Sequence, residues 1–369
     1  MDFLTIVYLV VGVVLLVLGA EWLVRGASAL AARLGIAPIV IGLTVVAFGT
    51  SAPEMAVSIG GAISGNADVA LGNVIGSNTF NILFILGLSA AISGLSINQR
   101  LLRLDIPILI VVSAVVYGLA WNGVVGRIEG IVLFIGILVY TIWLIVAARK
   151  EGITESPEVL AEYADAEKET EGGASDKPVY YQVGLVLIGL ALLIIGSNLL
   201  VSAATEIATA LGVSDLVIGL TVVAAGTSLP ELATSVMAAI RGRRDIAVGN
   251  VVGSNIFNLL AVLGSSAAVS KNGISVSDDA LNLDFPVMLV ATIVLIPICW
   301  NGFAIKKWEG ILLGMFYVAY VAYLILQAGE DGPPEIFRTM MLIVVPLVLL
   351  TFSVTGFQGW RRHRALQTT

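Results

Sequence analysis

A 40-residue stretch occurs twice in this chain, and each copy carries a glutamate inside sequence that is otherwise apolar. Residues 42–81 read GLTVVAFGTSAPEMAVSIGGAISGNADVALGNVIGSNTFN. Residues 219–258 read GLTVVAAGTSLPELATSVMAAIRGRRDIAVGNVVGSNIFN and match without a gap at 26 of 40 positions. Two segments that share only an apolar composition would agree at far fewer positions, so the match indicates an internal duplication.

The composition places this duplication in a membrane. Hydrophobic residues make up 58% of the 369-residue chain and charged residues only 12%, which predicts a polytopic membrane protein. The 39 glycines are typical of closely packed membrane helices. The run Phe3–Val24 has neither a basic n-region nor a small-residue cleavage site, so we interpret it as a first transmembrane helix and not a signal peptide.

Eleven apolar segments are long enough to span a bilayer, which takes about 20 residues. With the N-terminus outside, 16 of the 19 Lys and Arg residues fall on the inner side, as the positive-inside rule requires. This orientation predicts a protein of the cell membrane with a cytoplasmic C-terminus. The predicted spans are approximately Phe3–Val24, Ile36–Ser64, Val69–Ser93, Leu104–Trp121, Ile128–Ala147, Tyr180–Ala204, Val213–Ile240, Ile246–Val269, Leu283–Trp300, Ile305–Leu326 and Thr339–Gly356.

The duplication is wider than its most similar part. LDIPILI at 104–110 resembles LDFPVML at 283–289, and WNG occurs at both 121–123 and 300–302. Helices one to five therefore correspond to helices six to ten, and because five is odd, the two halves face opposite ways. The predicted fold is an all-α polytopic membrane protein with two inverted five-helix repeats, ten transmembrane helices, and an additional C-terminal helix. The predicted units are 1–147 (first repeat), 148–178 (acidic cytoplasmic loop), 179–327 (second repeat) and 328–369 (extra helix and basic tail).

Residues 151–177 form the one long hydrophilic segment and contain nine acidic residues. We interpret it as a solvated cytoplasmic linker. A regulatory Ca²⁺ site is the alternative, but the segment lacks the D-x-D-x-D-G spacing that would cage the ion. The helix predicted at 339–356 lies outside the repeat and would return the basic tail to the cytoplasm.

Glu54 and Glu231 are the residues whose transfer into the bilayer costs the most free energy in the predicted spans. A carboxylate at the bilayer centre costs at least about 2.5–3.5 kcal/mol. Residues 44–55 and 221–232 contain no Lys or Arg that could neutralise it. A bound cation would do so. A protonated glutamate that bonds to a neighbouring helix is the structural alternative, but it accounts for one glutamate better than for a duplicated one.

A proline precedes each glutamate. Because proline lacks an N–H group, Pro53 and Pro230 free the carbonyls of Gly49 and Gly226, four residues earlier. A freed carbonyl in hydrocarbon needs a partner, either a cation or a buried water. We therefore predict that both helices are broken here.

The second part of each copy has three polar residues at i, i+4 and i+8, which share one stripe of a helix: Asn73, Ser77 and Asn81, and then Asn250, Ser254 and Asn258. Glycines at 72 and 76, and at 249 and 253, form GxxxG steps. Such steps usually serve simple packing. Here the close approach would also bring the amides against the broken helix.

The donors are carboxylate, amide, hydroxyl and backbone oxygens. Neither the single Cys299 nor the single His363 lies near them in sequence, which argues against a zinc site. Oxygen ligands suit Ca²⁺ and Na⁺. Two carboxylates balance one divalent ion or several monovalent ions, and displacement of one ion by the other with alternating access is antiport. We expect no cofactor and no nucleic-acid partner.

GTSAPE with GNVIGSNTFN, and GTSLPE with GNVVGSNIFN, resemble the two α-repeats of the cation/Ca²⁺ exchanger superfamily, and within it the prokaryotic sodium/calcium exchangers. The resemblance covers helices one to ten. It implies a ten-helix inverted repeat with Na⁺ and Ca²⁺ bound by both repeats. The ligands that it implies, with the two alanines acting through their carbonyls, are Ala47, Thr50, Ser51, Glu54, Ser77, Asn81, Ala224, Thr227, Ser228, Glu231, Ser254 and Asn258.

The resemblance also implies that helices one and six slide across the other helices. Their glycines suit a sliding contact, although packing alone would also use them: Gly12, Gly19, Gly26, Gly184, Gly189 and Gly196. The chain departs from some relatives, K⁺-dependent exchangers among them, which carry Asp where Asn258 stands. This symmetric site, with two Glu and two Asn, weakens the case for K⁺ co-transport.

The sequence therefore predicts a secondary antiporter that exchanges Na⁺ for Ca²⁺ at a midplane site. The alternatives are an H⁺/Ca²⁺ or K⁺-dependent antiporter and, with less support, a cation channel. Inverted repeats with one glutamate pair favour alternating access over a continuous pore. An enzyme is not expected, since the motifs contain no His or Cys partner and no nucleophile arrangement.

Overall fold

The computed structural model describes residues 3–34, 36–151, 178–211, 224–300 and 302–327. The predictions for the acidic loop, the eleventh helix and the basic tail lie outside these ranges. So do residues 219–223, which begin the second copy of the motif.

Apolar helices dominate the described ranges. Eight of them are long and apolar enough to cross a membrane, and a bent pair makes a ninth. The structure thus confirms a helical polytopic membrane protein. The eight are α1 (Phe3–Leu34), α5–η2–α6 (Ala67–Phe80, Asn81–Leu86, Gly87–Ser93), η3–α7 (Leu101–Asp105, Ile106–Ala120), α8 (Arg127–Glu151), α10 (Val179–Ala210), α14–η5–α15 (Arg244–Phe257, Asn258–Val262, Leu263–Val269), η6–α16 (Ala280–Asp284, Phe285–Trp300) and α17 (Lys307–Gln327), where η marks a π-helical segment.

The bent pair is the span that carries the first glutamate. It consists of α2 (Pro38–Ile41), η1 (Gly42–Val46) and α3 (Ala47–Thr50), followed by α4 (Ala52–Ile63) at an angle of 46°. In the second copy, α12 (Ala224–Thr227) and α13 (Leu229–Ile240) flank a break at Ser228. The linking serines have nearly the same backbone angles, φ −82° and ψ 9° at Ser51 and φ −89° and ψ 10° at Ser228. The predicted breaks before the glutamates are confirmed.

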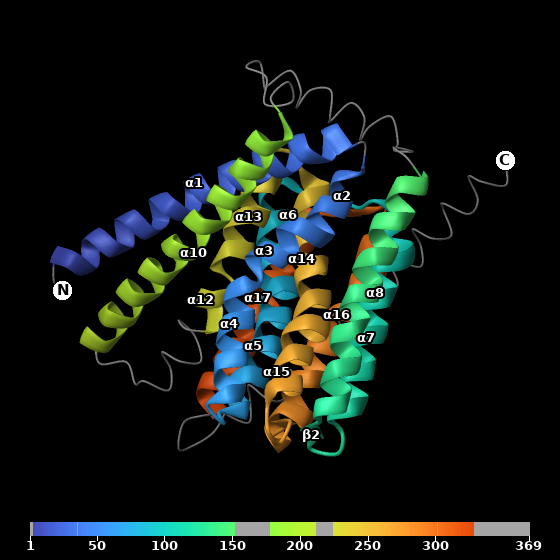
Figure 1. Ribbon diagram of the computed structural model, residues 1–369. Coiled ribbons are helices and arrows are strands. Elements are labelled where there is room, and N and C mark those ends of the chain that lie inside the picture. The colour runs from blue at the N-terminus through green and yellow to red at the C-terminus, as the bar shows by residue number, and fades with distance from the viewer. Residues whose placement is uncertain (1–2, 35, 152–177, 212–223, 301, 328–369) are drawn as a thin grey trace.

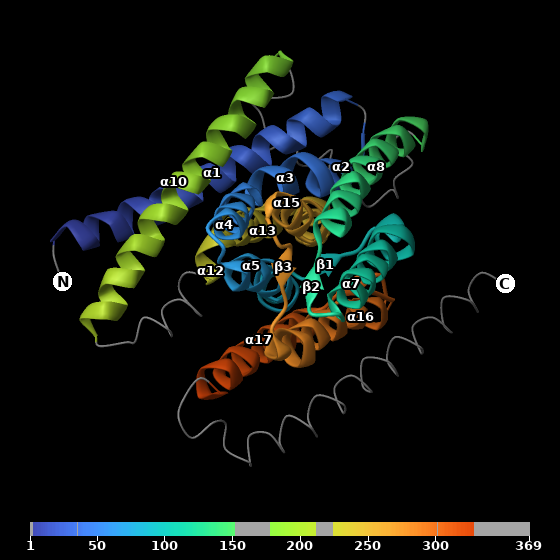
Figure 2. The same ribbon diagram turned by 60° about the horizontal axis from the view of Figure 1, so that its bottom comes forward.

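Helices α1 and α10 lie side by side as a tilted pair across the outside of the bundle (Figures 1 and 2). The order of the contacts shows that the two helices run antiparallel: the earlier glycine of α1 contacts the later glycine of α10, and the later contacts the earlier. A Cβ atom on Gly12 would lie 2.9 Å from the carbonyl oxygen of Gly196, and one on Gly19 would lie 2.8 Å from that of Gly189. Glycine is therefore required at these positions to let the two backbones approach.

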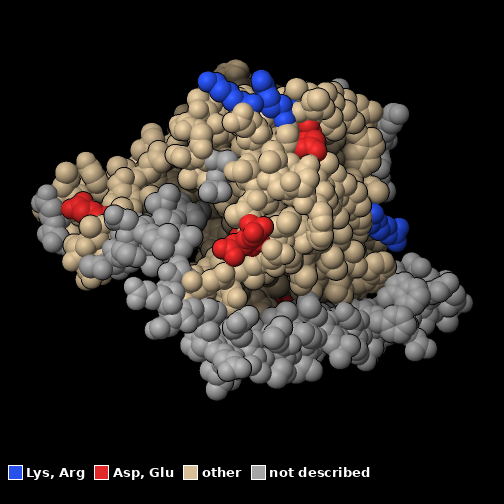
Figure 3. All heavy atoms as spheres, turned by 90° about the horizontal axis from the view of Figure 1, so that it is seen from below, with Lys and Arg blue, Asp and Glu red and all other residues tan. Residues whose placement is uncertain are grey.

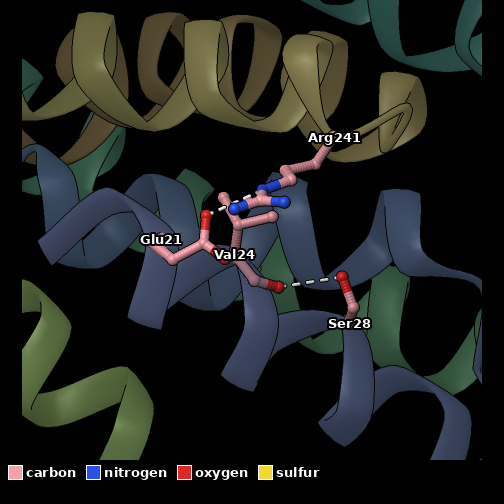
Figure 4. A network of polar contacts seen from close by, with 4 residues as sticks. All are labelled: Glu21, Val24, Ser28 and Arg241. Carbon is pink, nitrogen blue, oxygen red and sulfur yellow. Dashed lines mark hydrogen bonds and ion pairs between the residues drawn. The ribbon is translucent and has the colours of Figure 1, made fainter. Parts of the chain in front are cut away.

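This packing assigns most of the glycines of helices one and six to a mutual contact, whereas a Cβ atom on Gly184 would meet no atom of the described residues within 4 Å. Gly12, Gly19, Gly189 and Gly196 face the partner helix and not the bundle, so the structure favours the packing interpretation over a sliding surface. A salt bridge at 2.8 Å ties this pair to the bundle, from the Nε atom of Arg241 after α13 to the carboxylate of Glu21 on α1 (Figure 4).

Two short antiparallel ladders join the halves of the chain, which the all-helical prediction did not include. Strand β1 (Leu95–Ser96) pairs with β4 (Ala304–Ile305), and β2 (Val124–Val125) pairs with β3 (Ile274–Ser275). Each ladder takes one strand from each half, and exchanging the halves converts one ladder into the other. The ladders pair backbone groups that would otherwise lack partners at the helix ends.

The outer surface is largely uncharged. Seen from below, Lys, Arg, Asp and Glu of the described residues occupy a few separate spots on a neutral surface (Figure 3). Large apolar side chains on the outer helices are exposed, for example Val132 on α8 and Val318 on α17, each 61%. Such a surface is stable when the surrounding solvent is lipid.

The helix contacts through glycine yield a test of the fold. A Cβ atom on Gly130 of α8 would lie 2.7 Å from the Gly264 carbonyl oxygen and the Ala268 nitrogen, whereas one on Gly136 would meet Leu260 at an ordinary 3.6 Å. We expect Gly130→Ala to lower stability by about 1–3 kcal/mol through overpacking. Gly136→Ala on the same helix is the matched control and should be neutral or stabilising. Melting temperatures of the purified variants in detergent measure both, and an equal effect of the two substitutions would contradict this packing.

Candidate cation site

The two broken spans place their glutamates in the protein interior. Glu54 lies in the first turn of α4 and Glu231 in the first turn of α13, and both are fully buried. A carboxylate is favoured at a helix N-terminus, where unpaired N–H groups and the helix dipole concentrate positive potential.

Each glutamate accepts a hydrogen bond from the other repeat. The Ser228 hydroxyl donates to Oε1 of Glu54 at 2.8 Å, and the Ser51 hydroxyl donates to Oε1 of Glu231 at 3.0 Å. Ser228 is also hydrogen-bonded to the hydroxyl of Ser77 at 3.0 Å. The serine at each helix break therefore serves the glutamate of the opposite repeat.

Asn73 links three segments of the site. Its Nδ2 atom donates to the Glu54 carbonyl at 3.1 Å and to the Ser58 hydroxyl at 2.9 Å, while its Oδ1 atom accepts from the Thr227 hydroxyl at 3.1 Å. Both ends of the Asn73 amide are hydrogen-bonded. Asn73 therefore connects these segments, and its amide oxygen is not left over as a cation ligand.

Asn250 repeats this arrangement in the second copy. It donates to the Glu231 carbonyl at 3.4 Å and to the Ser235 hydroxyl at 2.9 Å, and it accepts from the Thr50 hydroxyl at 3.2 Å. The sequence placed Asn73 and Asn250 on the polar stripe, but their bonds to the threonines of the opposite repeat could not be inferred from spacing.

Asn81 and Asn258 stand where α-helix turns into π-helix, the first residues of η2 and η5. Short π-helical segments occur frequently at functional sites. The amide of Asn81 donates to Oδ1 of Asn255 at 2.9 Å, and that of Asn258 donates to Oδ1 of Asn78 at 3.2 Å. The ligand prediction did not include Asn78 and Asn255, although the repeated N-x-x-N spacing pointed to them.

Several oxygens of this cluster have no hydrogen-bond donor among the described residues. They are buried, and include Oε2 of Glu54, Oε2 of Glu231, Oδ1 of Asn81 and Oδ1 of Asn258. An unsatisfied buried polar atom costs about 1–3 kcal/mol, and more when it is charged. Four such oxygens, two of them on carboxylates, can act as ligands of a cation, which would satisfy them.

The remaining predicted residues lie around the same cluster. The Thr227 and Thr50 hydroxyls donate to Asn73 and Asn250, and Ser254 is fully buried. The Ala47 carbonyl accepts the Ser51 N–H at 3.0 Å. Ala224 is the first residue of α12.

One carbonyl freed by proline has a partner that the sequence did not reveal. The Ser197 hydroxyl on α10 donates to the Gly226 carbonyl at 2.6 Å. In the first half, Ala20 stands at the position of Ser197 and has no hydroxyl to offer the Gly49 carbonyl. Ser197 lies 29 positions from Gly226, so no local pattern could identify it.

The GxxxG step of the second copy provides the predicted close approach. A Cβ atom on Gly253 would lie 2.8 Å from Leu43 and Ala47 of the broken span, and one on Gly249 would lie 3.0 Å from the Ile39 carbonyl. In the first copy, a Cβ atom added to Gly72 or Gly76 would meet no atom of the described residues within 4 Å.

The fold and the site together define a class of protein. The chain is an integral membrane protein in which two copies of one motif enclose a buried cluster of oxygen donors. This is the organisation of secondary transporters built from internal repeats.

Comparison with known proteins identifies the family. A family model described as sodium/calcium exchanger protein matches residues 4–146 and 181–326. The chain is 38% identical to the putative antiporter CaxA of Alkalimonas amylolytica over 85% of this chain and 96% of CaxA. It is 32% identical to the sodium/calcium exchanger MaX1 of Methanosarcina acetivorans over 80% of this chain and 91% of MaX1.

A solved structure of the sodium-calcium exchanger NCX_Mj, soaked with 10 mM Na⁺ and zero Ca²⁺, superimposes with a TM-score of 0.74 at 31% identity. The match covers 88% of this chain and all of NCX_Mj. The chain belongs to the sodium/calcium exchanger protein family, and is an antiporter of the sodium/calcium exchanger type.

The Ser197 contact gives a prediction about stability. Ser197→Ala should leave the Gly226 carbonyl without its hydroxyl donor and lower stability by about 1–3 kcal/mol. Ser202→Ala on the same helix is the matched control, because that hydroxyl is exposed and bonds only to the Asn198 carbonyl of its own helix. Thermal unfolding in detergent should separate the two variants. Indistinguishable melting temperatures would show that the Ser197 bond does not support the break.

Proposed function

We propose that this protein exchanges Na⁺ for Ca²⁺ by alternating access, with both ions competing for one site between the two repeats. The observation that carries the proposal is the crossed pair of serine–glutamate bonds, each of which leaves one carboxylate oxygen free. Ser228 occupies Oε1 of Glu54 and Ser51 occupies Oε1 of Glu231, so the two Oε2 atoms lack a donor among the described residues. Two such carboxylates balance the charge of one Ca²⁺.

The proposed ligands fall into three kinds of oxygen. The carboxylates supply the charge, the amide oxygens of Asn81 and Asn258 supply neutral donors without competing hydrogen bonds, and hydroxyl and backbone oxygens complete the shell. The proposed set is Ala47, Thr50, Ser51, Glu54, Ser77, Asn81, Ala224, Thr227, Ser228, Glu231, Ser254 and Asn258.

We further propose that the two halves form an inverted ten-helix repeat with the site near the bilayer midplane. The antiparallel contact between α1 and α10 supports this, since these helices hold equivalent places in the two halves. The two interchangeable ladders support it as well. The distribution of Lys and Arg favours an outer N-terminus and insertion in the cell membrane.

Alternating access would require α1 and α10 to move as one unit. Their glycine contacts join them closely, while the pair is tied to α13 by the salt bridge between Glu21 and Arg241. That bridge is partly exposed, and such bridges contribute only about 0–1 kcal/mol. It can therefore break during transport at little cost.

Flux measurements in vesicles test the choice of driving ion. Vesicles loaded with Na⁺ and diluted into Na⁺-free buffer should take up ⁴⁵Ca²⁺, and uptake should stop when the Na⁺ gradient is removed. A pH gradient applied without Na⁺ is the control for H⁺/Ca²⁺ exchange, and added K⁺ is the control for K⁺ dependence. Uptake that follows the pH gradient and ignores Na⁺ would overturn the proposal.

Charge-neutral substitutions test the glutamates. Glu54→Gln and Glu231→Gln each remove half of the negative charge that balances Ca²⁺, so each should reduce exchange at least about 100-fold, the scale expected when a charged buried partner worth about 3 kcal/mol is lost. Glu206→Gln on α10 makes the same chemical change at an exposed position and should leave exchange intact. Near-normal ⁴⁵Ca²⁺ flux in either of the first two variants would remove that glutamate from the site.

A further inference from the structure

The amide groups of Asn81 and Asn258 can serve a cation only in one orientation. An asparagine presents a carbonyl oxygen at one end and two N–H donors at the other, and the donor end repels a cation. In both residues the NH₂ end bonds to an asparagine of the opposite repeat, and the Oδ1 atom is left without a donor among the described residues. Something in the surroundings must select this orientation.

The selection begins at a backbone carbonyl, which can only accept. The Nδ2 atom of Asn78 donates to the Asn255 carbonyl at 3.3 Å, and this fixes the NH₂ end of Asn78 on that side. Its Oδ1 atom must then be the acceptor that faces Asn258, which donates at 3.2 Å. The free oxygen of Asn258 is consequently directed away from Asn78. Each step follows from the one before, because reversing either amide would set two donors or two acceptors against each other.

Asn255 makes the equivalent contacts with the first repeat. The Nδ2 atom of Asn255 donates to the Asn78 carbonyl at 3.2 Å, and its Oδ1 atom accepts from Asn81 at 2.9 Å. All four asparagines are buried, with at most 1% of each residue exposed. The four side chains thus form a closed reciprocal set that takes two members from each repeat.

We propose that Asn78 and Asn255 are positioning residues that hold the amides of Asn258 and Asn81 with their oxygens toward the transported ions. The inference rests on the proposed function, since it assigns a task to residues next to that site. Outer partners that orient metal ligands in this way typically contribute about 10- to 100-fold to affinity. The set also makes each amide ligand depend on the opposite repeat.

A double-mutant cycle separates orientation from simple structural support. Asn78→Ala should raise the KM for both Na⁺ and Ca²⁺ about tenfold or more, because the Asn258 amide loses the acceptor that fixes it. An aspartate in place of Asn258 has two equivalent oxygens and no amide to orient. In the Asn258→Asp background, the additional Asn78→Ala substitution should therefore raise KM less than twofold.

Support for the fold alone predicts a different result. If Asn78 merely holds the Asn255 carbonyl, its loss would raise KM by the same factor in both backgrounds, and that additivity would overturn the inference. Thr79→Ala is the matched control, because among the described residues this neighbouring buried hydroxyl bonds only to the Ile75 carbonyl of its own helix. It should leave both KM values unchanged in either background.

The reciprocal half of the set provides a second, independent cycle. Asn255→Ala with Asn81→Asp should show the same non-additivity, and this cycle decides the question if Asn78→Ala does not yield folded protein on size-exclusion chromatography. Failure of the proposed function would be seen separately, as absence of Na⁺-driven ⁴⁵Ca²⁺ uptake by the unsubstituted protein. Exchange in that protein with additive effects in the cycles would overturn the positioning role alone.

Discussion

A carboxylate placed inside a membrane bundle is the constraint on which the rest of this structure depends. Glu54 and Glu231 are fully buried in segments without Lys or Arg side chains, and a buried charge without a partner is among the costliest features a protein can hold. The proline-induced helix breaks, the helix N-termini and the serine hydroxyls all reduce that cost. They do not remove it, because one oxygen of each carboxylate still lacks a donor among the described residues.

The partners come from the opposite copy of the motif. Ser51 donates a hydrogen bond to Glu231 and Ser228 donates one to Glu54. Asn78 and Asn255 exchange hydrogen bonds in the same reciprocal way. The serine hydroxyl that donates to each glutamate thus belongs to the other repeat. These crossed bonds support the proposal that the two copies of the motif together form one site.

The sequence revealed what depends on local chemistry. Pro53 and Pro230 lack the N–H that the carbonyl four residues earlier would accept, so the two helix breaks could be predicted, and the structure confirms them. The contacts of Asn78 and Asn255 depend on which helix of the other repeat faces them. Their side-chain partners Asn81 and Asn258 are the first residues of π-helical segments, which the sequence did not predict.

Other features depend on long-range packing. Ser197 reaches a carbonyl 29 positions away, and the glycines of α1 face α10, as the antiparallel approach of the two helices determines. A glycine in sequence indicates that something comes close, but not which surface does. Such residues can be assigned only when the arrangement of the helices is known.

In the proposed alternating-access cycle, the differences between the halves determine how the two access states are populated. If the repeats were identical and inverted, exchanging them would convert the outward-open state into the inward-open state, and both would have the same free energy. A preference for one state must therefore arise from positions where the halves differ. Two such positions are adjacent on the tilted helices: Ala20 corresponds to Ser197, and Glu21 corresponds to Asn198.

Both differences change a contact with the bundle. Ser197 bonds to the Gly226 carbonyl, and Glu21 pairs with Arg241, whose counterpart is Ser64. A hydrogen bond of this kind contributes about 0.5–1.5 kcal/mol and an exposed ion pair about 0–1 kcal/mol. Contributions of this size shift a two-state equilibrium up to about tenfold without fixing the protein in one state. The proposed ligands are the same residue types in both halves, whereas these two contacts of α1 and α10 with the bundle differ between the halves.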